Sequence, residues 1–361
     1  MVDDRLSRCF HSARRCGILL HWRWVATRTI PQTRWGEGRV KVLQIRSVSI
    51  RYVVGKKEVR AVEDVSFDVQ ERDVVGLVGE SGSGKTTLAH GIMRLLPPNA
   101  YFKNGEILLL GKNIVKMKEN EVRKYRWKDY SIVFQKSMNA LSPVHRVGEQ
   151  MKEALLIHQP NLSDEQMMKR IRETLDLVRL PSRVIRLYPH ELSGGMMQRV
   201  MIALALINNP KFVIFDEATT ALDVVTQGQI LDEIKKLVKD LSLTAMVITH
   251  DIGVVSEICN KVAVMYAGRL MEFGPLDKVV YEPLHPYTKA LLKSHPDFLE
   301  PGEKMMGIPG NLPDLTLPMK GCAFAPRCPY AEKICFSETP KPVEVGERVV
   351  ACFKVKEVER T

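Results

Sequence analysis

Alternating apolar and polar positions open the patterned part of the chain. Residues 42–52 follow this two-residue period for much of their length, and residues 59–70 follow it again after the turn-forming Gly55-Lys56-Lys57. A period of two is that of a strand with one buried face, and a short Gly-containing turn joins antiparallel neighbours. The pattern therefore predicts two antiparallel strands, with Tyr52 closing the first.

Continuous apolar runs come next, separated by segments with helical spacing. Strands that are buried on both faces read in this way, and helices between them cover the two faces of a parallel sheet. The pattern predicts an α/β fold. The apolar runs are residues 74–78, 131–135, 211–215 and 245–249, and hairpin strands are expected at 104–111, 262–265 and 269–273.

Composition divides the chain into three parts. Residues 1–40 carry no sustained period, and we expect a disordered basic leader or a start codon assigned too early. Residues 41–280 hold the predicted sheet, and within them residues 137–192 have helical spacing, which predicts a helical subdomain. Residues 281–361 are rich in proline and predict a loop-rich extension, with one helix near 287–292.

The charge is mildly basic once the leader is set aside. The net charge is +11, and the first 40 residues contribute eight arginines against three acidic residues. The remainder gives no reason to expect a nucleic-acid partner. The longest uninterrupted apolar segment, residues 200–207, is far shorter than a membrane span. The chain is therefore not expected to cross a bilayer by itself.

A phosphate-binding pattern follows the run at 74–78. Residues 79–86 read GESGSGKT and match G-x-x-x-x-G-K-[ST], with a strand before and a helix after. Glycines let successive N–H groups curl around an anion at the helix N-terminus. Lys85 would then reach the β- and γ-phosphates of a nucleotide, and Thr86 would bind Mg²⁺. The predicted nucleotide-binding residues are Gly79, Ser81, Gly82, Ser83, Gly84, Lys85, Thr86 and Thr87.

Two carboxylates stand at the end of the run at 211–215. Asp216 lies where it can bind Mg²⁺, and Glu217 is the candidate general base that orients the attacking water. An Asp-Glu pair after a strand is often only a turn. Together with the phosphate-binding pattern, it predicts nucleotide hydrolysis.

The sequence Leu192-Ser193-Gly194-Gly195 decides between families of phosphate-loop proteins. An ordinary Ser helix cap would explain it locally. It resembles the signature motif of ATP-binding cassette ATPases, in which LSGG opens a helix and addresses the γ-phosphate of ATP held by a second subunit. This resemblance implies a P-loop NTPase fold of that type, with an antiparallel β subdomain and a helical subdomain. It also implies that Ser193, Gly194 and Gly195 act on the opposite subunit's nucleotide.

The resemblance assigns roles to four further residues. Tyr52 matches the aromatic residue that stacks on adenine, and Gln135 matches the glutamine that touches Mg²⁺ or water. Asp223 matches the loop that crosses the dimer interface, and His250 matches the switch histidine on the γ-phosphate. One departure is Ala218, where the family usually has proline after the catalytic Glu.

Residues 282–288, EPLHPYT, narrow the resemblance to the oligopeptide/dipeptide importer branch, and within it to the D-type ATPase subunit. The implied partners are a second ATPase subunit (a related F-type chain or a copy of itself), two transmembrane permease subunits that dock on the helical subdomain, and an extracytoplasmic solute-binding protein. The implied place is the cytoplasmic face of the membrane. Import of oligosaccharides or nickel, and a soluble cassette ATPase, stay open as alternatives.

Four cysteines in the extension ask for a separate explanation. Cys322, Cys328, Cys335 and Cys352 follow the spacing C-x5-C-x6-C-x16-C. Four thiols in a segment poor in core residues suggest a metal centre, and some subunits of the resembled branch hold a 4Fe-4S cluster in the corresponding region. We carry that cluster over to these four residues. Zinc, a disulfide or free thiols are the alternatives.

Overall fold

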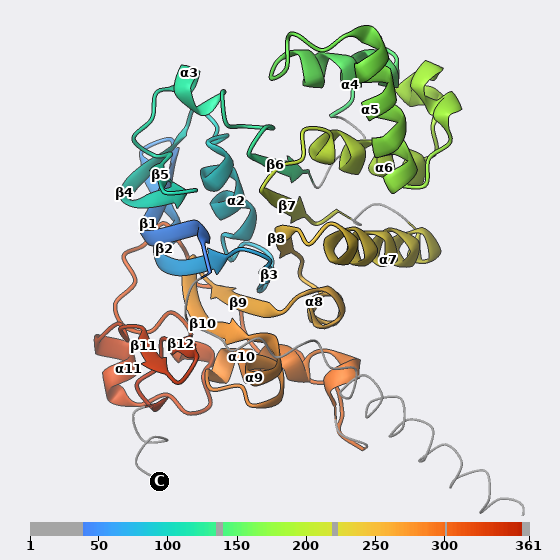
Figure 1. Ribbon diagram of the computed structural model, residues 1–361. Coiled ribbons are helices and arrows are strands. Elements are labelled where there is room, and N and C mark those ends of the chain that lie inside the picture. The colour runs from blue at the N-terminus through green and yellow to red at the C-terminus, as the bar shows by residue number, and fades with distance from the viewer. Residues whose placement is uncertain (1–38, 135–139, 219–222, 300–301, 356–361) are drawn as a thin grey trace, which may run out of the picture. The chain divides into compact units, whose positions relative to one another are not determined.

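The strand that leads into the phosphate loop, β3 (Val74–Val78), lies inside an eight-stranded sheet in the computed structural model (Figure 1). The structure describes residues 39–134, 140–218, 223–299 and 302–355. The predicted leader lies outside them, apart from residues 39 and 40. None of the helices in these ranges is long and apolar enough to span a membrane.

The eight-stranded sheet has the order β11-β12-β10-β9-β3-β8-β7-β6. Strands β6 to β9 and β3 run parallel, so the loops after their carboxyl ends gather at one edge of the sheet. The predicted strands are confirmed within a few residues at their ends. The bounds are β6 (Tyr130–Val133), β7 (Phe212–Asp216), β8 (Thr244–Ile248), β9 (Lys261–Tyr266) and β10 (Arg269–Pro275).

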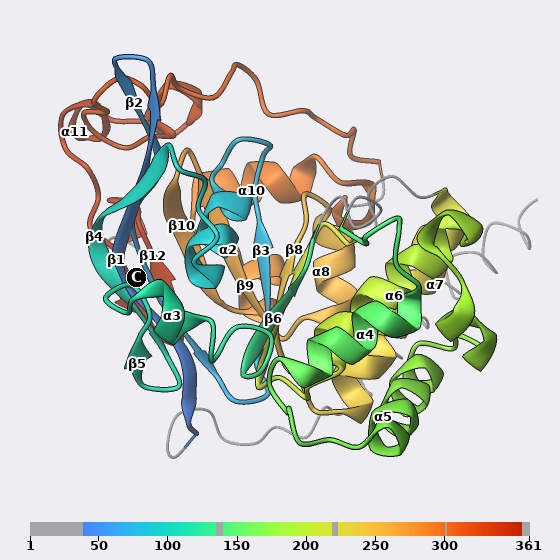
Figure 2. The same ribbon diagram turned by 90° about the horizontal axis from the view of Figure 1, so that it is seen from above.

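The predicted antiparallel pair, β1 and β2, belongs to a second sheet. This sheet has four strands, in the order β2-β1-β4-β5. Tyr52 pairs with Val59 near the turn, as the alternation predicts. The apolar face of this second sheet packs toward the first sheet, where β2 contacts β10 (Figure 2). The bounds are β1 (Lys41–Val54), β2 (Lys57–Gln70), β4 (Ala100–Leu109) and β5 (Lys112–Asn113).

Successive residues of the central strands face two different cores. Val74 and Val78 of β3 join one cluster of buried residues, whereas Val75 and Leu77 join the other. The first cluster contains the helices after β6, and the second lies between the two sheets and includes the helix after the phosphate loop. Both faces are therefore apolar, which explains the continuous apolar runs in the sequence.

The helical spacing within residues 137–192 is confirmed as helices. α4 and α5 pack on each other and on α6, and form the predicted helical subdomain (Figure 1). The bounds are α2 (Lys85–Met93), α3 (Glu119–Val122), α4 (Val147–Leu156), α5 (Asp164–Leu177), α6 (Gly194–Leu206), α7 (Val224–Asp240) and α8 (Ile252–Ile258).

The C-terminal region, residues 276–355, packs on the rest of the fold more extensively than its proline-rich composition predicts. The helix predicted near 287–292 is confirmed as α10 (Pro286–Lys293). Strand β12 (Arg348–Val350) pairs with β10 and so extends the main sheet, which the sequence did not predict. Phe324 is buried in the first core. The remaining elements are α9 (Leu276–Tyr281), α11 (Lys333–Ser337) and β11 (Val343–Val345).

Candidate functional site

The phosphate loop needs glycine at two positions for steric reasons. Gly79 has a φ of 148° and Gly84 a φ of 97°, both in the region that L side chains avoid. A Cβ on Gly79 would lie 2.0 Å from the carbonyl oxygen of Met265, and a Cβ on Gly84 would lie 2.2 Å from that of Ala61. Neighbouring backbone therefore fixes the loop's path into α2.

Lys85 folds its amine back onto this loop. Its Nζ donates to the carbonyl oxygens of Gly79 at 2.7 Å and Glu80 at 2.9 Å, and lies 3.3 Å from Ser83 Oγ. Burial lowers the pKa of Lys85, and the carboxylates of Glu217 and Asp216 oppose that shift. The amine is thus held at the loop by neutral acceptors that a phosphate oxygen would replace.

Thr86 and Asp216 bring the loop to the end of β7. Thr86 Oγ1 donates to Asp216 Oδ1 at 3.2 Å, and Asp216 is buried. Burial raises the pKa of Asp216 to about 6. A buried carboxylate beside a hydroxyl is a donor set that suits Mg²⁺, because the ion's charge would offset the cost of burying the carboxylate.

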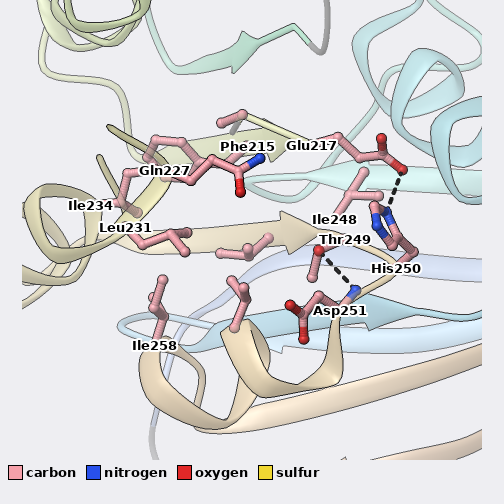
Figure 3. Close-up of a pocket in the computed structure, with 13 residues that line it drawn as sticks. Phe215, Glu217, Gln227, Leu231, Ile234, Ile248, Thr249, His250, Asp251 and Ile258 are labelled. Carbon is pink, nitrogen blue, oxygen red and sulfur yellow. Dashed lines mark hydrogen bonds and ion pairs between the residues drawn. The ribbon is translucent and has the colours of Figure 1, made fainter. Parts of the chain in front are cut away.

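Glu217 and His250 face each other at the carboxyl ends of β7 and β8 (Figure 3). Glu217 Oε1 lies 3.5 Å from His250 Nδ1. Glu217 has a positive φ of 43°, and its N–H donates to the carbonyl of Ile248 at 2.9 Å. Backbone in this region is strained for a side chain other than glycine, and the neighbouring strand holds it there. The carboxylate is aimed past the sheet edge, next to the histidine ring.

A cavity of about 110 Å³ adjoins this pair. Its far wall is apolar, with Leu231 and Ile234 from α7 and Ile258 from α8 (Figure 3). Thr249 Oγ1 accepts the N–H of Asp251 at 3.0 Å and so fixes the turn that carries His250. The pair therefore has an apolar support on one side and solvent on the other, where 63% of the His250 side chain is exposed.

Tyr52 reaches the start of α2. Its hydroxyl lies 3.3 Å from Thr87 Oγ1, which places the ring next to the phosphate loop. Ser81 and Gly82 at the tip of the loop are exposed, whereas Ser83 is buried. The structure brings together every predicted nucleotide-binding residue of 79–87, with Tyr52, Asp216 and Glu217 around them.

Ser193 lies in a different part of the fold. It caps α6, because its Oγ accepts the N–H of Met196 at 3.3 Å. Asp223 caps α7 and accepts from both the N–H and the hydroxyl of Thr226. A Cβ on Gly195 would lie 2.8 Å from Thr226 Cγ2. The two predicted interface motifs are thus neighbours at the starts of α6 and α7.

Gln135, predicted to touch Mg²⁺ or water, lies outside the described residues. Strand β6 ends at Val133, two residues before it. Its predicted role stays a prediction.

The four cysteines of the C-terminal region line one small cavity, together with His285 and Phe324. The N–H of Cys322 donates to the carbonyl of Cys335 at 2.7 Å. Burial raises the pKa of Cys322 to about 11, and the neighbouring thiols add to this shift. The cysteines in the described part of the chain are all free, so the structure contains none of the disulfides considered from the sequence.

In the described residues, the four cysteines do not form a ready-made ligand group for the predicted 4Fe-4S cluster. Within the residues that the structure describes, no group of three or more His, Cys, Asp or Glu side chains is arranged to hold a metal ion. The four thiols share a cavity without forming such a group.

The sequence did not predict two residues that contact the phosphate loop. The hydroxyl of Tyr287 accepts the N–H of Glu80 at 2.9 Å, and Arg327 Nη1 lies 2.9 Å from Glu80 Oε2. Tyr287 belongs to the segment 282–288 and to the predicted helix near 287–292, but neither pattern indicates a contact with the phosphate loop. The sequence around Arg327 contains no motif or period that marks it as a contact of the phosphate loop.

Two family patterns match the chain. Residues 62–220 match the family described as "ABC transporter". Residues 271–335 match the family described as "Oligopeptide/dipeptide transporter, C-terminal region". The first match spans the phosphate loop, Ser193 and Asp216, and the second spans three of the four cysteines.

Several curated proteins are similar over nearly their whole length. The oligopeptide transport ATP-binding protein OppD of Bacillus subtilis is 44% identical, over 85% of this chain and 87% of that protein. OppD of Escherichia coli is 41% identical, over 91% and 97%. The dipeptide transport ATP-binding protein DppD of Caldanaerobacter subterraneus is 40% identical, over 88% and 98%.

Solved structures agree with this fold. The dimeric structure of MJ0796, a bacterial ABC transporter cassette, is 30% identical with a TM-score of 0.59, and the match covers 65% of this chain and 98% of that one. A second dimeric structure of MJ0796, in a post-hydrolysis state bound to ADP and Pi, has a TM-score of 0.58 at the same identity and coverage.

Proposed function

Because the chain belongs to the ABC transporter family, in its oligopeptide/dipeptide branch, we propose that it is the ATP-hydrolysing subunit of an importer of di- and oligopeptides. The observation that carries this function is the contact between Thr86 and Asp216. It brings the phosphate loop to the strand end where Glu217 and His250 face each other. Phosphate binding and water activation are thereby adjacent.

The residues divide the reaction between them. Lys85 and the loop N–H groups bind the β- and γ-phosphates, with Tyr52 placed for the adenine ring. Mg²⁺, held by Thr86 and Asp216 and with Gln135 as the remaining candidate, would neutralise charge on the phosphates. Glu217 accepts a proton from the water that attacks the γ-phosphorus, while the bond to the ADP oxygen breaks. His250 orients that carboxylate and contacts the γ-phosphate.

We propose that a second ATPase subunit completes the site. Ser193 to Gly195 lie at the start of α6, which packs on β6, α4, α5 and α7. The free N–H groups and the positive end of the helix dipole at this terminus would suit a phosphate held by another chain. Asp223, adjacent through Thr226, would lie at the same interface.

The partners follow from the proposed function. Two transmembrane permease subunits would dock on the helical subdomain, residues 137–192, and an extracytoplasmic binding protein would deliver the solute. The chain would then act at the cytoplasmic face of the membrane, as a peripheral subunit. We assign residues 41–280 to the nucleotide-binding domain and 281–361 to the C-terminal domain of this branch.

The finer proposal for the C-terminal domain is a 4Fe-4S cluster on Cys322, Cys328, Cys335 and Cys352. The support is that all four thiols line one largely apolar cavity, and four cysteines are the usual ligand set of such a cluster. A cluster would supply positive charge to thiols whose ionisation burial opposes. Anaerobic purification followed by iron and sulfide analysis tests this, and protein that is folded without either element would contradict it.

Reconstitution tests the function as a whole. The chain is purified with a second ATPase subunit, permease subunits and a binding protein of this importer branch, and placed in vesicles with ATP and labelled di- or oligopeptides. We expect ATP-dependent peptide uptake, and none with Glu217→Gln. Uptake of an oligosaccharide or of nickel, and not of peptides, would change the assigned solute. ATP hydrolysis by a chain that never associates with a permease would contradict its assignment to an importer.

A further inference from the structure

Glu80, the second residue of the phosphate loop, is held from the C-terminal region. Its N–H donates to the hydroxyl of Tyr287 at 2.9 Å, and its Oε2 lies 2.9 Å from Arg327 Nη1. A third residue comes close at the loop tip, because a Cβ on Gly82 would lie 3.6 Å from Leu312 Cδ1. Three points of a region more than 200 residues away in sequence thus meet one loop.

The same Glu80 takes part in holding the loop's lysine. Its carbonyl oxygen accepts from Lys85 Nζ at 2.9 Å and from the N–H of Ser83 at 3.1 Å. The peptide groups on both sides of Glu80 are therefore fixed, one by Tyr287 and one by the loop itself. A shift of Glu80 would move the acceptor that positions the Lys85 amine and would change the path of the N–H groups that face a phosphate.

Tyr287 is placed rigidly enough to act on the loop. It is fully buried, with its ring centroid 4.6 Å from that of Tyr266 and 5.3 Å from that of Phe324. Burial raises the pKa of its hydroxyl, so the group stays protonated at physiological pH. Packing on two aromatic rings leaves the hydroxyl little freedom to move.

Arg327 is equally constrained. Only 6% of its side chain is exposed. Nε and Nη2 donate to the carbonyls of Pro309 at 2.7 Å and Ile308 at 2.9 Å, and Nη1 lies 3.2 Å from the Tyr266 hydroxyl. One guanidinium therefore ties the segment before Leu312, the aromatic cluster and the phosphate loop together. A charge-assisted contact of this kind is stronger than a neutral hydrogen bond.

We propose that Tyr287 and Arg327 are positioning residues for ATP binding: through Glu80 they keep the phosphate loop in the geometry that receives the β- and γ-phosphates. Nucleotide affinity then depends on the C-terminal region as well as on the loop. This inference rests on the proposed function, since it presupposes that the loop binds ATP. An alternative is that the same contacts only attach the C-terminal region to the core.

Four single variants and one double variant of the full chain separate these two roles. Tyr287→Phe removes one hydroxyl, Arg327→Met removes the charge, and Arg327→Lys keeps it. Arg348→Met is the matched control, because Arg348 also has a largely buried side chain in the C-terminal region, but its partners, the carbonyls of Lys278 and Glu282 and the carboxylate of Glu272, do not belong to the phosphate loop. For each variant the thermal unfolding midpoint is measured without nucleotide and with saturating Mg·ATP, and the ATP dissociation constant by calorimetry.

If these residues position the phosphate loop, variants that lose the contacts should bind ATP more weakly. We expect Tyr287→Phe to weaken ATP binding about 2- to 10-fold and Arg327→Met about 10-fold or more, with Arg327→Lys restoring part of the loss. The rise in midpoint on adding Mg·ATP shrinks in parallel. Arg348→Met lowers the nucleotide-free midpoint but binds ATP like the unaltered chain. A Glu80→Gln, Arg327→Met double variant loses no more than Arg327→Met alone.

Two results would overturn the inference. One is that folded Tyr287→Phe and Arg327→Lys proteins, and Arg327→Met where it folds, bind ATP as tightly as the unaltered chain. The other is that Arg348→Met weakens ATP binding as much as the loop-contacting variants, which would indicate a general structural role. Failure of the unaltered chain to bind ATP would instead contradict the proposed function, so the two failures are distinguishable.

Discussion

The hydroxyl of Thr86 donates to the buried carboxylate of Asp216, joining the start of α2 to the end of β7 at 3.2 Å. A single neutral donor offsets little of the cost of burying a negative charge. The fold therefore opposes ionisation of this carboxylate, and a bound cation would stabilise its charged form. This contact and its neighbours determine how the protein should respond to acidity, metal and substitution.

The first prediction is a pH dependence due to Asp216. Burial raises the pKa of this carboxyl to about 6, above its value in the unfolded chain. The native state therefore binds more protons than the unfolded state between pH about 4 and about 6, and the free energy of unfolding falls as pH rises through this range. For Asp216 alone the loss is about 3 kcal/mol. Denaturant unfolding without metal, at intervals across this range, measures it.

Asp216→Asn isolates this contribution from those of other groups. Burial also raises the pKa values of Glu233 and Glu272, so the unaltered chain combines several titrations. We expect the difference in unfolding free energy between the two proteins to change with pH in the stated direction. A constant difference would contradict the assignment. Adding Mg·ATP should reverse the trend for the unaltered chain only, because the metal requires the ionised carboxylate.

Glu217→Gln should uncouple ATP binding from hydrolysis. The amide keeps the shape of the side chain but cannot accept the proton of the attacking water, so turnover falls about 10²- to 10⁴-fold. ATP-dependent association of ATPase subunits should survive, and sedimentation with and without ATP detects it. Glu257→Gln, on an exposed carboxylate paired with Lys235, is the control and should hydrolyse normally. Undiminished turnover in Glu217→Gln would show that another group is the base.

Lys85→Met should abolish tight nucleotide binding and leave the fold intact. The amine now bonds two loop carbonyls, and an apolar chain of similar length removes its charge from a buried place. Loss of a charged hydrogen bond to phosphate weakens ATP binding by about 10- to 100-fold. Lys116→Met, at an exposed lysine beside Glu106, serves as the control. Calorimetric titration with ATP decides, and unchanged affinity would be inconsistent with the assigned role.

Gly84→Ala should disrupt the loop, whereas Gly228→Ala should not. A Cβ at Gly84 meets the Ala61 carbonyl at 2.2 Å, in backbone with a φ of 97°, and we expect a loss of at least about 2 kcal/mol. Gly228 lies inside α7, and a Cβ there would meet nothing within 4 Å, so alanine should gain about 0.5–1 kcal/mol. Thermal unfolding of both variants compares them. Equal midpoints would contradict the steric argument.

The sequence predicts those parts of the fold and site that local patterns specify. The two-residue period predicted β1 and β2, because one face of that sheet is buried and the register follows the apolar face. The meeting of Thr86 with Asp216 was also predictable. Parallel strands place their following loops at one sheet edge, so two motifs that each follow a strand must come close.

Contacts without a local pattern could not be predicted. Arg327 and Glu80 are 247 residues apart, and nothing around Arg327 marks it as a partner of the phosphate loop. Strand β12 has three residues, too few for a period, and it forms because β10 offers it an edge. The thiol cavity was anticipated as a cluster of four cysteines, but spacing alone could not say how closely the thiols would approach.

The pairing of β12 with β10 also has a consequence for synthesis of the chain. Glu272 and Phe273 pair with Val350 and Val349, so this edge of β10 gains its partner strand only after residue 350 has left the ribosome. An unpaired strand edge is a template for association with other chains. The nascent protein therefore passes through a long interval, between synthesis of β10 and of β12, in which this sheet edge is open, and chaperone protection would matter most during that interval.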